Sequence, residues 1–334
     1  MLKNYIAGNK NFWNGRIDSN EDYDCFRWHQ WVEFLDLNDD RSEVFEGKLG
    51  FAFLGFECDY GINLNKGRVG AANGPRSIRK ELSNLPCQFN SDIKLFDAGN
   101  IYVDNLSLIE AQENLAKAVD KILSLNLFPI LLGGGHEIAF GHYMGLFNHY
   151  KNTGTKQNIG IINFDAHFDL RPYAETGGSS GTMFRQIYDM NKEEGIKYSY
   201  FCLGIQRHSN TVNLFKYADE IGAKYVLAKD IVNGDMYSIF EKLDDFIREQ
   251  DNIYVTICSD VFSTSFAPGV SAPQPLGLDP EKVILFLKRI FSYNKVISFD
   301  IAEVSPRFDQ DSTTASLAAV LIFSVVTSLA KFKQ

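Results

Sequence analysis

Short apolar runs recur along the chain from residue 51 onward, and most of them lack the strict alternation of a half-exposed strand. Such runs are typical of strands buried on both faces of a parallel sheet. Longer stretches between them, such as 108–125 and 281–291, have apolar residues at spacings of three and four and therefore predict helices. The runs predict eight strands, at residues 51–56, 93–96, 128–132, 159–164, 198–203, 224–228, 253–257 and 296–299.

This order of strands and helices predicts an α/β fold in three layers, with helices on both faces of a mostly parallel, eight-stranded sheet. The chain has 334 residues, and we expect one domain over residues 1–334. Residues 1–48, rich in Asn, Asp, Trp and Phe, are interpreted as an N-terminal extension packed on this domain. The reason is that aromatic side chains more often cover apolar surface than bind a ligand.

Composition narrows the class of partner. A hydrophobic content of 45% and a charged content of 22% are those of an ordinary globular protein. The net charge of −9 disfavours nucleic acids and anionic membranes, which require a basic surface. The five cysteines are scattered without CxxC spacing, and no signal peptide or apolar stretch of about 20 residues is recognised. We therefore expect a cytoplasmic protein with a small-molecule substrate and with neither a nucleic-acid nor a membrane partner.

Potential metal ligands stand directly after three of the predicted strands. They are six imidazole, carboxylate and thiol side chains: His136, Asp165, His167, Asp169, Cys258 and Asp260. Those that share a strand end are two residues apart, so in extended chain they face the same side. Because parallel sheets bind ligands beyond the carboxyl ends of their strands, we expect the six groups to converge. Two loops rich in Gly, Pro and Asn, 61–73 and 263–277, are interpreted as rims of the same pocket.

This set of donors predicts a pair of divalent ions. Two histidines with carboxylates that can bridge are too many and too anionic for one tetrahedral zinc, and they suit ions of the Mn²⁺ type. Two such ions can share a water and lower its pKa, so that hydroxide attacks an electrophilic carbon at neutral pH. Asp169 is the candidate that orients this water or carries its proton onward. One such motif alone is more often structural, but coincidence at three strand ends favours a metal site.

Several strings in the sequence resemble the ureohydrolase superfamily, which contains arginase, agmatinase and formimidoylglutamase. The resemblance covers about residues 50–330. Its motifs are Gly134-Gly135-His136-Glu137, Asp165-Ala166-His167-Phe168-Asp169, the Asp260 segment leading into Phe266-Ala267-Pro268-Gly269, and Phe299-Asp300-Ile301-Ala302-Glu303-Val304. The formimidoylglutamase branch is resembled most closely, through the strings at 13–18, 27–30, 65–75, 179–182 and 270–273.

The resemblance implies an arginase-like fold with a two-manganese centre that hydrolyses the C–N bond of a linear amidine. For this branch the substrate is N-formimidoyl-L-glutamate, which yields L-glutamate and formamide in histidine degradation. Carried over by position, His136 and Asp169 bind one ion, His167 and Asp260 bind the other, and Asp165 bridges them. Members of the superfamily commonly form trimers or hexamers, so the resemblance also implies a homo-oligomer.

Substrate-binding residues follow from the resemblance and from the chemistry of the substrate. Glu303 matches the carboxylate that holds the cationic end of the substrate in arginase-like enzymes, and a planar cationic formimidoyl group suits it. Ser180 stands where arginases carry a histidine, which favours a substrate other than arginine. The two carboxylates of the substrate require cations. Arg68 is the first candidate, and Lys66 and Arg185 follow it.

Cys258 departs from the superfamily pattern, in which an aspartate at this position bridges both ions. A thiolate is a softer ligand that suits zinc or iron better than manganese, and it offers one donor atom where a carboxylate offers two. Cys258 ligates as a thiolate, or the site holds fewer ions, or the chain has lost catalysis and kept the fold. The alternative functions are therefore a guanidino hydrolase acting on agmatine or a related compound, and a catalytically impaired binding protein of the same fold.

Overall fold

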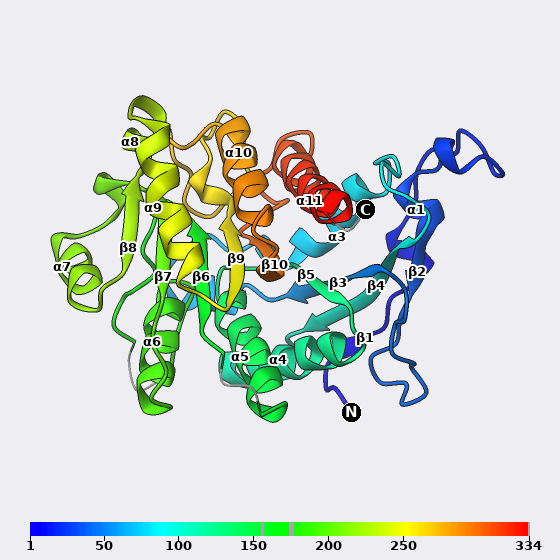
Figure 1. Cartoon of the computed structure of the whole chain (residues 1–334), viewed down its shortest axis with the longest axis horizontal. Helices are drawn as coiled ribbons and strands as arrows, with labels where there is room; N and C mark the ends of the chain where they lie inside the picture. Colours follow the sequence, from blue (N-terminus) through cyan, green and yellow to red (C-terminus); the bar gives the residue numbers. More distant parts are fainter. Residues whose placement is uncertain (155–156, 174–176, 333–334) are drawn as a thin grey trace.

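The computed structural model describes residues 1–154, 157–173 and 177–332, and over these residues it contains one sheet of ten strands flanked by helices (Figure 1). The eight predicted strands are present as β3 (Leu49–Glu57), β4 (Ile93–Tyr102), β5 (Phe128–Leu132), β6 (Ile159–Phe164), β7 (Tyr200–Ile205), β8 (Lys224–Leu227), β9 (Asn252–Cys258) and β10 (Val296–Ala302). They pair in parallel in the order β4-β3-β5-β10-β9-β6-β7-β8. The predicted parallel sheet is therefore confirmed.

Two further short strands extend the sheet beyond the eight that the pattern predicts. β1 (Tyr5–Ile6) pairs antiparallel with the end of β4, and β2 (Val32–Phe34) pairs in parallel with its beginning. Strands of two and three residues are too short to show an alternation of apolar and polar positions, so the sequence pattern does not reveal them. They tie the N-terminal residues to the edge of the sheet at β4.

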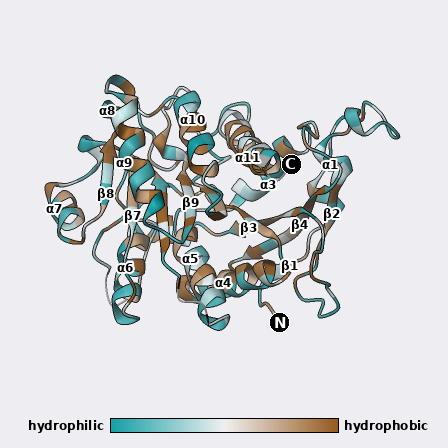
Figure 2. Ribbon diagram, in the orientation of Figure 1, coloured by the Kyte–Doolittle hydropathy of each residue, from teal (hydrophilic) through white to brown (hydrophobic). Residues whose placement is uncertain are grey.

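Helices cover both faces of the sheet, which confirms the predicted three layers (Figure 1). One face carries α3 (Gly74–Leu82), α9 (Met236–Arg248), α10 (Pro280–Phe291) and α11 (Thr313–Phe332). The opposite face carries α4 (Leu108–Ser124), α5 (Ile138–Asn152), α6 (Met183–Glu193) and α7 (Val212–Glu220). Shorter helices are α1 (Trp28–Trp31), α2 (Tyr60–Leu64) and α8 (Ala228–Asn233). Figure 2 shows hydrophobic strands between helices with mixed surfaces, as a sheet buried on both faces requires.

Local sequence explains how these elements form. Along β3, Phe51 and Phe53 belong to the core on one face of the sheet, while Ala52 and Leu54 belong to the core on the other. The predicted helix 108–125 is present as α4 and begins at a capping box in which Ser107 and Glu110 satisfy each other's backbone N–H groups. The predicted helix 281–291 is present as α10.

Helix α11 is an apolar stretch that the sequence interpretation did not recognise. By length and composition alone Thr313–Lys331 could cross a membrane, which is weak evidence because buried core helices pass the same test. In the structure 56% of this stretch is buried. Leu321, Ile322 and Val325 are fully buried in the core that α11 shares with α3 and α10. Its apolar composition therefore has a structural reason in the packing of this layer.

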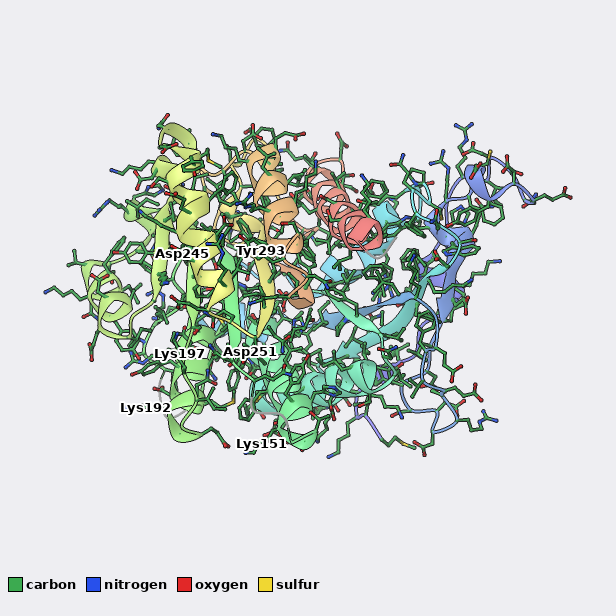
Figure 3. The ribbon with its side chains drawn as sticks, viewed as in Figure 1. Lys151, Lys192, Lys197, Asp245, Asp251 and Tyr293 are labelled. Carbon is green, nitrogen blue, oxygen red and sulfur yellow. The ribbon has the colours of Figure 1, made fainter. Side chains whose placement is uncertain are left out.

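The crossover helices run back from the carboxyl ends of the strands, so their own ends mark the opposite edge of the sheet. Lys151 near the end of α5 and Lys192 near the end of α6 both lie toward the lower edge of the view in Figure 3. Lys151 Nζ pairs there with Glu194 Oε1 at 2.7 Å. This ion pair joins two helices on one face. It lies at the edge of the sheet opposite the carboxyl ends of the strands.

A buried ion pair connects α3, β4 and the N-terminal residues. The Arg79 guanidinium donates to Asp97 Oδ1 at 2.7 and 3.1 Å and to Asn100 Oδ1 at 2.7 Å. The indole Nε1–H of Trp13 donates to the other oxygen of Asp97 at 2.8 Å. Arg79 and Asp97 are both 0% exposed, so each charge depends on the other for compensation.

Asp97→Asn should lower the free energy of unfolding by about 3–5 kcal/mol, because it leaves the buried Arg79 guanidinium without a counter-charge. Trp13→Phe removes one hydrogen bond and keeps the ion pair, so its loss should be clearly smaller, about 1–2 kcal/mol. Urea unfolding followed by circular dichroism measures both. Equal losses for the two variants would contradict this account of the ion pair.

Candidate metal centre

Four neighbouring strands in the middle of the sheet end side by side and carry the candidate ligands. In the order β5-β10-β9-β6, Leu132 is level with Ile301, Ala302 with Cys258, and Phe164 with Ile257. His136 lies four residues beyond β5, Glu303 and Asp165 follow β10 and β6 directly, and Cys258 ends β9. The parallel register therefore brings side chains that are far apart in sequence to one edge, as the sequence analysis expected.

The three glycines before His136 bring the chain close to neighbouring strands. The N–H of Gly133 donates to the carbonyl of Ile301 at 2.7 Å, and that of Gly134 donates to the carbonyl of Phe56 at 2.9 Å. A Cβ atom at Gly134 would lie 1.7 Å from the carbonyl oxygen of Cys58. The glycines thus serve the approach of backbone to backbone, which carries His136 into the site.

The candidate ligands form two clusters that share Asp165. One contains His136, Asp165 and Cys258, the other contains Asp165, His167 and Asp260, and within each cluster the ligand atoms lie within 4.8 Å of one another. Asp165 Oδ2 is 3.0 Å from Nδ1 of His136, and its Oδ1 is 3.5 Å from Nδ1 of His167. One oxygen of the same carboxylate therefore faces each histidine, as in a ligand that bridges two ions.

Asp169 and Glu303 lie beside these clusters in a strained backbone conformation. Asp169 Oδ2 is 3.2 Å from Nδ1 of His136, and Glu303 Oε1 accepts a hydrogen bond from the backbone N–H of His136 at 3.0 Å. The φ angle is +49° at Asp169 and +66° at Glu303, a region of backbone conformation that residues other than glycine rarely occupy. Such strain is concentrated at functional sites, where the surrounding structure maintains it.

Burial shapes the charges of the site. Burial, followed by the nearby charge of Asp165, raises the pKa of Asp169 to about 6. Burial also raises the pKa of Asp260, and that of Glu303 to about 8. For Asp165, burial acts in the same direction, but the hydrogen bonds with His136 and His167 outweigh it and lower the pKa. Several carboxyl groups thus compete for few compensating charges in one place.

A pair of divalent cations fits this arrangement. Among the described residues, Asp260 Oδ1 and Glu303 Oε2 are buried without a hydrogen-bond partner, and both residues line the cavity. Buried polar atoms normally have partners, so these two oxygens indicate a partner from outside the chain. Imidazole nitrogen and carboxylate oxygen are also the donors that Mn²⁺ accepts, with the thiol of Cys258 as the exception.

The ligand clusters form the floor of a cavity of about 180 Å³. Both expected rim loops contribute to its wall, the first through Asn65 and Gly67 and the second through Ser271 and Ala272. Ser180 also lines the cavity, so it lies where a substrate-binding residue is expected. Among the described residues, the lining is Asn65, Gly67, His136, His167, Asp169, Arg171, Ser180, Cys258, Asp260, Ser271, Ala272 and Glu303.

The Arg68 guanidinium makes its contacts outside this cavity. It donates to the carbonyls of Val270 at 2.7 Å and Ser271 at 3.0 Å, and it lies 4.2 Å above the ring of Phe308. Arg68 therefore holds the rim loop in place and does not line the cavity. These contacts do not support the expectation that the Arg68 guanidinium is directed at a substrate carboxylate, which stays a prediction.

Among the described residues, Arg171 is the cation that lines the cavity, and the sequence analysis missed it. It is exposed at the rim, and its backbone N–H donates to the carbonyl of Gly181 at 2.9 Å. Lys66 and Arg185 do not line the cavity, and Arg185 lies 4.2 Å above the ring of Tyr217. A signal for Arg171 was present in the sequence, because it continues the two-residue spacing of Asp165, His167 and Asp169.

A sequence model of the arginase family matches residues 49–327. The chain belongs to the arginase family. A formimidoylglutamase of Clostridium tetani is 63% identical to it over 328 residues, which is 98% of this chain and 97% of the relative. The solved formimidoylglutamase of Bacillus subtilis has a TM-score of 0.79 at 23% identity and covers 96% of this chain and 97% of that chain, which shows the arginase-like fold. The Trypanosoma cruzi formiminoglutamase N114H variant with Mn²⁺ has a TM-score of 0.75 at 25% identity, over 88% of this chain and 96% of that chain.

A buried hydrogen-bond network supports His136 from behind in this member of the arginase family. His136 Nε2 is 3.0 Å from the hydroxyl of Thr256, which donates to Asp300 Oδ1 at 2.6 Å. The second oxygen of Asp300 accepts from the Tyr254 hydroxyl and lies against Nδ1 of His142, both at 2.5 Å. All five residues are at most 1% exposed. With Nε2 bound to Thr256, the ring presents Nδ1 to the carboxylates, and metal-binding histidines usually have their other ring nitrogen held by a hydrogen bond in this way.

Thr256→Val should weaken metal binding about 10- to 100-fold, because it removes the hydroxyl that orients the His136 ring while keeping the side-chain shape. Thr256→Ser retains the hydroxyl and should bind metal nearly as the wild-type protein does. Calorimetric titration of the metal-free proteins with Mn²⁺ measures the difference. Equal affinities for the valine variant and the wild type would show that the network does not support the ligand.

Proposed function

We propose that this protein hydrolyses the C–N bond of N-formimidoyl-L-glutamate to L-glutamate and formamide, a step of histidine degradation. The relationship to the Clostridium tetani formimidoylglutamase, which extends over nearly the whole of both chains, supports this substrate. The observation that carries the proposal is the polarity of the cavity. A free carboxylate oxygen of Glu303 lies beside the ligand clusters, and the cation of Arg171 lies at the rim. In a substrate with a cationic amidine and two carboxylates, the amidine matches the Glu303 carboxylate and the carboxylates match the Arg171 cation.

We propose further that two Mn²⁺ ions are held by six side chains: His136, Asp165, His167, Asp169, Cys258 and Asp260. The two clusters that share Asp165 and the Mn²⁺-containing structure of the Trypanosoma cruzi relative support a pair. When bound, such ions lower the pKa of a ligated water and make hydroxide available at neutral pH.

Two carboxylates have assigned roles in the reaction. Glu303 Oε2 is buried and free, so it pairs with the protonated formimidoyl group and orients its carbon. Asp169 accepts a proton as water adds to that carbon and returns it to the amine nitrogen of glutamate as the C–N bond breaks. Asp169 lies 3.2 Å from His136 and lines the cavity, which supports this role.

The rival functions make different demands on the same cavity. Agmatine carries a second cationic group and no carboxylate, so the Arg171 guanidinium would repel it. Ser180 offers a neutral hydroxyl at the rim and is proposed to hydrogen-bond the substrate there. A catalytically impaired protein of this fold, the alternative that Cys258 raises, predicts no turnover of any amidine. A cytoplasmic location and a homo-oligomeric state stay predictions.

The protein loaded with Mn²⁺ should release formamide from N-formimidoyl-L-glutamate and act far more slowly on arginine and agmatine. Glu303→Gln should reduce kcat/KM for formimidoylglutamate by about 100-fold or more, because it removes the charge opposite the amidinium. A formamide assay with parallel elemental analysis measures rate and metal content together. Full activity of the glutamine variant, or faster turnover of agmatine by the wild type, would refute the proposal.

Arg171→Ala should raise KM for formimidoylglutamate about 10- to 100-fold, the usual loss for a hydrogen bond to a charged group. An N-alkyl formamidine without carboxylates should not show this loss, because it has no partner for Arg171. Arg185→Ala is the matched control, since its guanidinium lies over Tyr217 and outside the cavity. If both variants behave alike toward formimidoylglutamate, Arg171 does not bind a carboxylate.

A further inference from the structure

Cys258 belongs to the ligand cluster at His136 and not to the cluster at His167, although its thiol also hydrogen-bonds to Asp260. Its sulfur lies within 4.8 Å of the ligand atoms of His136 and Asp165, while the second cluster consists of Asp165, His167 and Asp260. The first position thus offers nitrogen, oxygen and sulfur donors, and the second offers nitrogen and oxygen alone. The sharing of Asp165 keeps the two positions adjacent although their chemistry differs.

The surroundings of Cys258 direct its sulfur to the site. Cys258 is 2% exposed, is not in a disulfide and lines the cavity. It ends β9 beside Ala302 of β10, so the strand register places its side chain between the loops that carry His136 and Asp165. This burial restricts the reaction of the Cys258 thiol with solutes. The groups next to the thiol are the candidate metal ligands His136 and Asp165.

A second buried cysteine nearby provides a contrast. Cys202 on β7 is also fully buried, but its sulfur lies 3.7 Å from the carbonyl oxygen of His167 and 3.7 Å from Nδ2 of Asn163. Cys202 neither lines the cavity nor belongs to either ligand cluster. Burial next to the site is therefore common to both cysteines, and access to the metal position distinguishes Cys258.

We propose that Cys258 makes the two metal positions chemically unequal, so that the position at His136 prefers Co²⁺, Zn²⁺ or Fe²⁺ to Mn²⁺. This inference rests on the proposed metal centre and deepens it. A thiolate is a soft donor that favours these ions, and the preference adds to the general rise in affinity from Mn²⁺ to Zn²⁺. As the sulfur–metal bond forms, the S–H bond breaks and its proton leaves to solvent. The position at His167 has hard donors only, so it lacks this added preference for softer ions.

Titration of the metal-free, full-length protein with Co²⁺ tests the ligation directly. A thiolate-to-cobalt charge-transfer band in the near ultraviolet should grow in and saturate after one equivalent, while elemental analysis finds two ions bound. The band should be absent from Cys258→Ser and Cys258→Asp and retained in Cys202→Ser. Circular dichroism establishes that each variant is folded, and the wild-type band by itself already decides whether sulfur is a ligand.

Competition between metals tests the preference. With Zn²⁺ and Mn²⁺ supplied together, the position at His136 of the wild-type protein should take up Zn²⁺ at a lower Zn²⁺ concentration than the position at His167, and Cys258→Asp should shift the first position toward Mn²⁺ by about tenfold or more. Two bound Co²⁺ ions without the band would overturn the role of Cys258 and leave the two-metal centre standing. Failure to bind any divalent ion would overturn both, and the stoichiometry distinguishes the two results.

Discussion

Parallel pairing of β5, β10, β9 and β6 is the constraint on which the whole site depends. Because these strands end level with one another, side chains between residues 132 and 303 meet at one edge although most are distant in sequence. Cores on both faces maintain this register, since a slip by one residue would turn every strand side chain toward the opposite layer. The packing of the layers is therefore also what positions the ligands.

The same edge concentrates negative charge, and the chain compensates this charge only in part. His136 and His167 each face two carboxylates, and Asp165 divides its oxygens between them. Three carboxylate oxygens in the described part of the chain remain buried without a partner, and those of Asp260 and Glu303 belong to residues that line the cavity. A group of this kind is stable only if cations from outside complete it. The proposed binding of metal ions and of a cationic substrate would thus both follow from the same uncompensated negative charge.

Rigid support surrounds this charged edge. Behind His136, the chain of Thr256, Asp300 and His142 satisfies buried polar groups on β9, β10 and α5. Farther along the sheet, the Arg79–Asp97 pair anchors the N-terminal residues to β4. Both networks are fully buried, so each holds the residues around it in one arrangement. The candidate ligands therefore have a defined geometry.

The sequence by itself determined the eight parallel strands, the helices on both faces and five of the candidate ligands with their clustering, because apolar periodicity and two-residue spacing are local signals. Only the tertiary structure decided that Arg171 lines the cavity while Arg68 holds a rim loop, and that Cys258 joins one cluster alone. It also revealed β1, β2 and the support of His136 by Thr256. The physical reason is that the direction of a long side chain, the pairing of a strand of two residues and the partners of a buried hydroxyl are set by atoms from distant parts of the chain.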